Sequence, residues 1–212
     1  PNLSFDRVQS EITKTIQANP RKAIRDYLEC DILNICFPKL ACFFPQQTPN
    51  FFPNYKLESE KRVFPLLLCS WLELKAFEVT SEEFNELEKH LKYFHIPYAK
   101  EIKIILSGLT KLNKRYKTNY PDALQEKILT SHCGEEIFWL YTLFQRRFQF
   151  PPLLNLSNLP EKIDGKTIIQ WGIKAMSGFE GVVMRVRQLQ IDGINDIAEL
   201  RSKVLMELSL SG

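Results

Sequence analysis

The sequence predicts an all-α fold, with an elongated multi-helix body followed by a small helical tail subdomain punctuated by glycines. Apolar residues recur at steps of three and four along most of the chain. No stretch shows sustained alternation of apolar and polar residues, and no Asn-Gly turn joins two such stretches. Amphipathic helices have the first period and half-buried strands the second, so the pattern favours helices throughout.

The first helix is expected over residues 4–17, and Asn19-Pro20 separates it from a second. Its apolar face consists of Phe5, Val8, Ile12 and Ile16. Pro20 fits the first position of the second helix, where the missing N–H and the fixed φ of proline cost nothing.

Residues 37–55 have a different composition, rich in proline and phenylalanine. The prolines that interrupt any helix there are Pro38, Pro45, Pro49 and Pro53. The aromatic side chains that need burial are Phe37, Phe43, Phe44, Phe51 and Phe52. We therefore expect a long irregular loop that is held across the core by its aromatic rings.

Helical spacing returns from Val63 to Phe77, and several further helix starts follow. Thr80-Ser81-Glu82-Glu83 is a capping box, and Pro97 and Pro121 begin two more helices. Gly134 precedes a helix with five residues directed at the core, namely Ile137, Phe138, Leu140, Tyr141 and Phe144.

A boundary is expected within residues 148–160, which carry prolines and no helical pattern. It gives a helical body over residues 1–150 and a helical tail over residues 151–212. Residues 165–193 of the tail hold five of the eight glycines in the chain. Apolar spacing within it predicts three short helices, and clustered glycines mark helix ends.

Composition is that of an ordinary globular protein, with 44% hydrophobic and 25% charged residues and a net charge of +3. No apolar run approaches the roughly 20 residues that cross a bilayer, so no membrane partner is expected. The five cysteines include no CxxC pair. We expect each to be a buried reduced thiol, which fits a cytoplasmic protein. The chain begins at Pro1 without a signal peptide or a methionine, which suggests a piece of a longer protein.

Catalytic and metal-binding patterns are missing from the sequence. Nucleotidyl transfer needs paired carboxylates to hold magnesium, commonly as Asp-x-Asp, and the chain contains no such pair. The adjacent acids Glu82-Glu83 and Glu135-Glu136 would point about 100° apart on a helix. We therefore expect no catalytic residue, no metal site and no cofactor in this chain.

The charge distribution points to a possible RNA contact. Residues 100–117 carry six bases and one acid. Within them, the cluster Lys111, Lys114, Arg115, Tyr116 and Lys117 combines cations with a ring that can stack on a base. A solvated helix end explains the same cluster, because the helix dipole favours cations there. The other candidate RNA contacts are Arg146, Arg147, Lys166, Gly178, Gly181, Arg185 and Arg187. Backbone amides freed between Gly178 and Gly181 would add a neutral phosphate site.

Two parts of the chain carry a family resemblance. The first is Leu3-Ser4-Phe5-Asp6-Arg7-Val8, with Glu11 and Lys14, followed by residues 20–40 ending in Phe37-Pro38-Lys39-Leu40. The second is the tail, with Gly165-Lys166-Thr167-Ile168-Ile169, Gly178-Phe179-Glu180-Gly181 and a later Gly193. Together they resemble the C-terminal body and tail of class II tRNA nucleotidyltransferases (CCA-adding enzymes) and bacterial poly(A) polymerases.

That resemblance implies a module that grips tRNA or another structured RNA while a separate catalytic head, as domain or subunit, adds nucleotides to the 3′ end. Mg²⁺ and ATP or CTP are then expected only for the head, whose motifs this chain lacks. The parent would be an RNA nucleotidyltransferase, adding either CCA or poly(A). The alternative is a non-catalytic helical scaffold or protein-interaction module without RNA binding, with residues 37–55 as its partner site.

Overall fold

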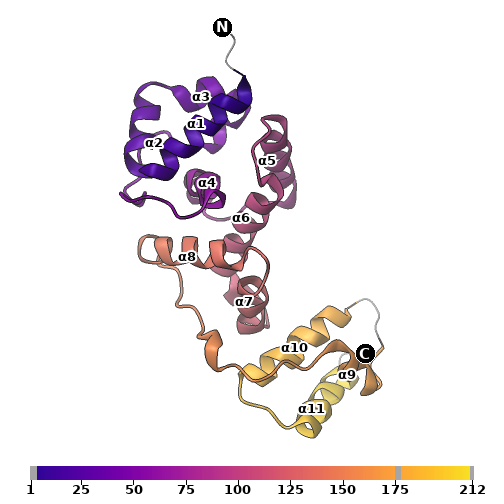
Figure 1. Cartoon of the computed structure of the whole chain (residues 1–212). Helices are drawn as coiled ribbons and strands as arrows, with labels where there is room; N and C mark the ends of the chain where they lie inside the picture. The colour runs from indigo at the N-terminus through magenta and orange to yellow at the C-terminus, as the bar shows by residue number, and fades with distance from the viewer. Residues whose placement is uncertain (1–3, 175–177, 211–212) are drawn as a thin grey trace. The chain divides into compact units, whose positions relative to one another are not determined.

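The computed structural model of the chain describes residues 4–174 and 178–210. The structure is 69% helical, and no strand occurs within those two ranges. Figure 1 shows helices joined by turns and by longer irregular stretches, such as those before α4 and after α8. The predicted all-α class is therefore confirmed.

The chain packs as two units. The first comprises Pro1–Asn113 and Ser131–Pro151, and the second comprises Lys114–Thr130 and Pro152–Gly212. The chain leaves the first unit for the second between Pro151 and Pro152, one residue from the boundary expected after residue 150. The sequence did not indicate that Lys114–Thr130 packs with the second unit, because helical periodicity continues on both sides of that segment.

The first unit is built around one apolar helix. The α-helices of this unit are α1 (Phe5–Ala18), α2 (Pro20–Glu29), α3 (Ile32–Cys36), α4 (Val63–Leu74), α5 (Ser81–Tyr93), α6 (Ala99–Asn113) and α8 (Gly134–Phe148). Two 3₁₀ helices, η1 (Pro38–Phe43) and η2 (Glu60–Arg62), connect them. Almost every residue of α4 is buried, and α1, α6, η1 and η2 all contact it. A helix that is apolar all round belongs at the centre of such a core.

Local signals set several helix starts as predicted. Pro20 is the first residue of α2, and the side chain of Asn19 accepts the Lys22 backbone N–H at 3.1 Å. The capping box that begins α5 is present: the Thr80 hydroxyl accepts the Glu83 N–H at 3.2 Å, and Glu83 accepts the Thr80 N–H at 2.9 Å. Hydrogen bonds, first from the Lys75 side chain and then from Thr80, lower the pKa of Glu83 to about 2.

The phenylalanines of residues 37–55 are all buried, as predicted, but Pro38–Phe43 forms the 3₁₀ helix η1 where an irregular loop was expected. Phe37 has no exposed surface and packs edge-on against Phe44, Phe64 and Phe94, with ring centroids 5.5–6.1 Å apart. The loop is therefore part of the core of the first unit.

The second unit has a smaller core of its own. Its α-helices are α7 (Pro121–Leu129), α9 (Gly165–Gln170), α10 (Phe179–Ile191) and α11 (Ile197–Leu210), with the 3₁₀ helices η3 (Arg115–Lys117) and η4 (Leu156–Asn158). The buried side chains that join α9, α10 and α11 are Ile168, Trp171, Ile173, Val186, Leu189, Leu200 and Val204. The three predicted tail helices are confirmed. Gly178 precedes α10 with φ near 95°, a conformation that favours glycine.

Two expectations about burial were wrong. Phe138 is 49% exposed. In α8 the residues Ile137, Leu140, Tyr141 and Phe144 share one face, and Phe138 lies about 100° away from Ile137 around the helix. Only Cys69 and Cys133 are buried, whereas Cys36 is partly exposed and Cys30 and Cys42 are exposed. All five cysteines are free thiols.

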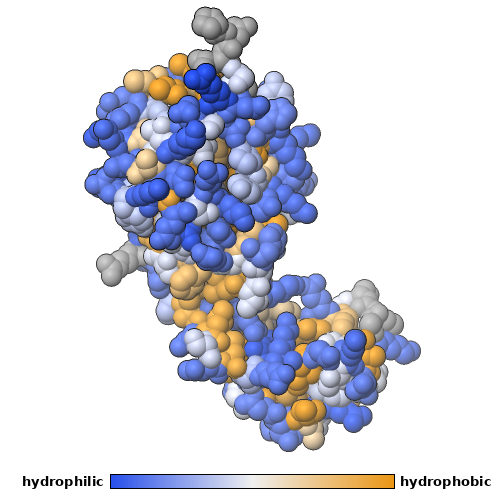
Figure 2. Space-filling view, in the orientation of Figure 1, coloured by the Kyte–Doolittle hydropathy of each residue, from blue (hydrophilic) through white to orange (hydrophobic). Residues whose placement is uncertain are grey.

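Surface hydropathy differs between the units. In Figure 2 hydrophilic residues cover most of the visible face of the first unit, and more apolar residues reach the surface of the second. The exposed apolar side chains of the second unit include Ile197, Met206, Leu208 and Leu210 on α11. No helix in the described ranges is both long and apolar enough to cross a membrane.

Candidate nucleic-acid interface

The basic segment predicted as an RNA contact is divided between the two units. Lys111 is exposed on the last turn of α6, in the first unit. The second unit holds the rest of the segment, which is Lys114 followed by the 3₁₀ helix η3 (Arg115–Lys117). Of these four residues, Tyr116 and Lys117 are exposed and Lys114 is half-buried.

Arg115 is not a surface cation, contrary to the prediction. It is 2% exposed, and its guanidinium donates to the Pro152 carbonyl. The same group donates to the Tyr116 hydroxyl at 3.2 Å and lies 4.9 Å from the centre of that ring. Burial therefore removes Arg115 from contact with RNA and makes it a positioning residue for Tyr116.

Tyr116 is the exposed aromatic side chain that this arrangement fixes. Its ring is 63% exposed, although Arg115 covers one part of it and holds the hydroxyl. Lys117, which is exposed, follows it in the chain. A restrained aromatic ring next to a cation can stack on a base and contact the adjoining phosphate.

Arg187 is likewise buried, which again contradicts the predicted RNA contact. Its guanidinium is bound by both carboxylate oxygens of Glu126 on α7, at 2.6 and 2.7 Å, and donates to the Pro160 carbonyl at 2.9 Å. Paired, desolvated charges of this kind hold structural elements together. Here the pair links α10 to α7, and sequence pattern could not reveal a partner 61 residues away.

Gly178, Gly181 and Arg185 are brought together, around a pocket of about 240 Å³. The amide of Gly181 is not free, however, because it donates to the Gly178 carbonyl at 2.9 Å. Arg185 donates twice to Glu207, at 2.8 and 2.5 Å. These hydrogen bonds lower the pKa of the Glu207 carboxyl, and they engage the guanidinium group of Arg185 that the prediction assigned to RNA.

The remaining predicted contacts are dispersed. Arg147 on α8 donates to Glu73 at 3.0 Å and lies 5.4 Å from the ring of Phe51. The side chain of Arg146 falls outside the described part of the structure. Lys166 is exposed in the first turn of α9, where Asp164 accepts the Thr167 N–H at 2.7 Å as a helix cap. The segment Asp164-Gly165-Lys166-Thr167 is therefore the start of helix α9.

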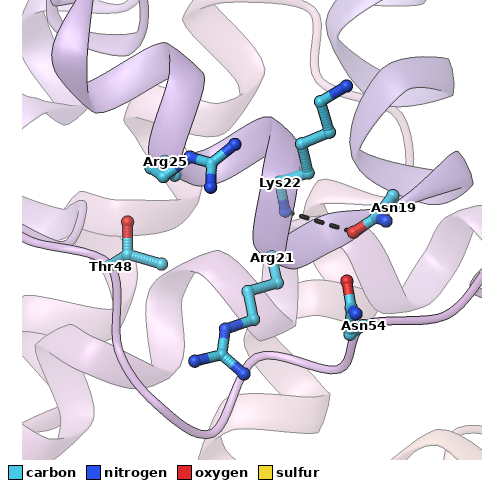
Figure 3. A pocket seen from close by; sticks show the side chains of 6 residues that line it. All are labelled: Asn19, Arg21, Lys22, Arg25, Thr48 and Asn54. Atoms are coloured by element: carbon cyan, nitrogen blue, oxygen red, sulfur yellow. Dashed lines mark hydrogen bonds between the residues drawn. The ribbon is translucent and has the colours of Figure 1, made fainter.

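A second concentration of positive charge was missed from the sequence. Arg21, Lys22 and Arg25 line a cavity of about 490 Å³ beside α2, drawn in Figure 3. A usable signal was present, since the first turn of α2 contains no acid. Cations in a first turn oppose the helix dipole, so a local reason for them should have been sought.

Within the described ranges, no three His, Cys, Asp or Glu side chains are grouped so as to hold a metal ion. Comparison of the chain with protein-family models, with curated proteins and with solved structures found no match.

Proposed function

We propose that this chain binds RNA, and that Tyr116 and Lys117 form its principal contact. The single observation that carries the proposal is an exposed tyrosine ring held in place by a buried arginine, beside an exposed lysine. Exposed aromatic side chains usually lose conformational freedom when they bind. A ring restrained beforehand loses less, which favours affinity.

The ligand suited to this pair is an unpaired base with its phosphate, as found in the loops and ends of a folded RNA such as tRNA. Proteins recognise such bases by stacking on aromatic rings, since every base has a π-face. The contact is then tolerant of sequence and depends on the shape of the RNA. This tolerance suits a module that grips many RNAs of one shape.

The place of this module in a larger reaction follows from the family resemblance. A chain without an Asp-x-Asp pair would hold RNA while a separate head, with its own Mg²⁺ and nucleotide, extends the 3′ end. Non-specific phosphate contacts would fix the register of the RNA. RNA nucleotidyltransferases of the CCA-adding and poly(A) type are the enzymes in which we propose this role.

Substitution of Tyr116 by alanine is expected to weaken RNA binding by about 1–3 kcal/mol, the usual contribution of one stacked base. That loss is roughly 5- to 150-fold in dissociation constant. Filter binding of the purified chain to tRNA measures it. Tyr116→Phe keeps the ring and should retain most of the affinity.

A matched pair of charge reversals separates RNA binding from general electrostatics. Lys117→Glu should reduce tRNA retention strongly, and Arg201→Glu, an exposed cation on α11, should reduce it only slightly. Equal losses for both variants would overturn the assignment of this contact. An absence of tRNA binding by the unmodified chain at low salt would instead favour the scaffold alternative. A partner site on residues 37–55 would then have to use side chains other than their buried phenylalanines.

A further inference from the structure

The described residues that line the cavity beside α2 are basic or neutral and polar. The residues that line it are Asn19, Arg21, Lys22, Arg25, Thr48 and Asn54. Figure 3 shows Thr48 and Asn54 on the loop across from α2, and the Lys22 ammonium group extending away from Arg21. None of these described residues is a carboxylate, so none of them neutralises the two guanidinium groups.

One acid outside the lining does contact this cluster. Asp26 accepts from the guanidinium of Arg25 at 3.1 and 3.2 Å, through a single oxygen, and both side chains are about half exposed. An exposed pair between adjacent residues is weak and exchanges readily with other ions. Arg21 and Arg25 lie one helical turn apart, on the same face of α2, where like charges repel. An anion between them removes that repulsion.

The backbone around the cavity is already satisfied and holds the loop in place. The backbone N–H of Arg21 donates to the Pro53 carbonyl at 3.2 Å, and that of Lys22 donates to the side-chain oxygen of Asn19 at 3.1 Å. The N–H of Leu57 donates to the Gln17 carbonyl at 2.7 Å, and the side chains of Phe51 and Phe52 are buried. The walls are therefore fixed, and a ligand would be recognised by side chains.

We propose that this cavity is a binding site for a phosphate-bearing ligand, held by the guanidinium groups of Arg21 and Arg25. Each guanidinium can donate two parallel hydrogen bonds to a phosphate, and the Thr48 hydroxyl and the Asn54 amide supply neutral donors. The volume of about 490 Å³ exceeds that of one phosphate group and falls in the range of small-molecule sites. Two guanidinium groups match the charge of a ligand with two linked phosphates. The site lies wholly in the first unit and does not depend on the RNA contact proposed at Tyr116.

Calorimetric titration of the full chain with inorganic pyrophosphate tests the site. We expect saturable binding that the double variant Arg21→Ala/Arg25→Ala weakens at least about tenfold, since charge-assisted hydrogen bonds are lost. The control Lys89→Ala/Lys100→Ala removes two exposed lysines of the first unit outside the cavity and should bind as the unmodified chain does. Circular dichroism establishes that both variants are folded. An absence of saturable binding, or equal weakening in both double variants, would overturn the proposal.

Two sources of phosphate are distinguished by a second arm, filter binding of tRNA to the same variants. If Arg21→Ala/Arg25→Ala weakens both pyrophosphate and tRNA binding, the site holds a phosphate of RNA. If it weakens only pyrophosphate binding, the site holds a small phosphorylated molecule. Tyr116→Ala should leave pyrophosphate binding unchanged, so failure of the RNA proposal and failure of this one give different results.

Discussion

Replacement of Glu126 by glutamine is expected to destabilise the second unit by about 3–5 kcal/mol, because Arg187 would keep its charge in a buried position without a carboxylate partner. The side chains of Arg187 and Glu126 are 5% and 14% exposed. Their pairing is bidentate, and Nη1 of Arg187 donates to the Pro160 carbonyl and to the Gln190 side chain. Loss of one partner of such a pair costs far more than loss of a surface ion pair.

Urea unfolding followed by circular dichroism measures this effect. Lys127→Gln is the matched control, because it breaks the neighbouring pair with Glu180, whose side chains are 52% and 74% exposed. That change should cost at most about 1 kcal/mol. The double variant Glu126→Leu/Arg187→Met should recover most of the stability that Glu126→Gln loses. A cost for Glu126→Gln no larger than the control would mean that Arg187 reaches solvent, as the sequence-based prediction had it.

Replacement of Phe37 by alanine is expected to destabilise the first unit by about 3–5 kcal/mol, through lost burial and the cavity left behind. Phe37 is fully buried, at the junction where the loop of residues 37–55 meets the core. Edge-on contacts with three other rings would be lost as well. The loop should loosen with it, since Phe44 lies against Phe37.

Phe138→Ala is the control for this experiment, because it removes the same side chain from a half-exposed position on α8. Its expected cost is about 1 kcal/mol, in proportion to the smaller buried area. Thermal unfolding of both variants and the unmodified chain gives the comparison. Similar losses at the two positions would contradict the burial described for Phe37 and Phe138.

The features that the sequence predicted well are those with local causes. Pro20 begins α2, and Thr80 and Glu83 cap α5, because a capping signal acts over a few residues. The three tail helices followed from apolar spacing between glycines. The aromatic loop was predicted because so many phenylalanines require burial whatever the fold.

The features that the sequence did not predict depend on partners far along the chain. The burial of Arg115 and Arg187 follows from the Pro152 carbonyl and from Glu126, which only the tertiary structure brings near. The cavity beside α2 needs the loop residues Thr48 and Asn54 to complete it. A charge pattern alone cannot distinguish a surface cation from one that a distant acid neutralises.

The salt dependence of tRNA binding tests the central claim, that this chain holds RNA through its phosphates, most directly. Filter binding at a series of salt concentrations measures the association constant for tRNA. Its logarithm should fall linearly with the logarithm of the salt concentration, with a slope of about −0.7 to −0.9 for each phosphate contacted. Lys117→Glu should make that slope shallower by about one contact. Affinity that is independent of salt, or no retention of tRNA at the lowest salt, would contradict the claim.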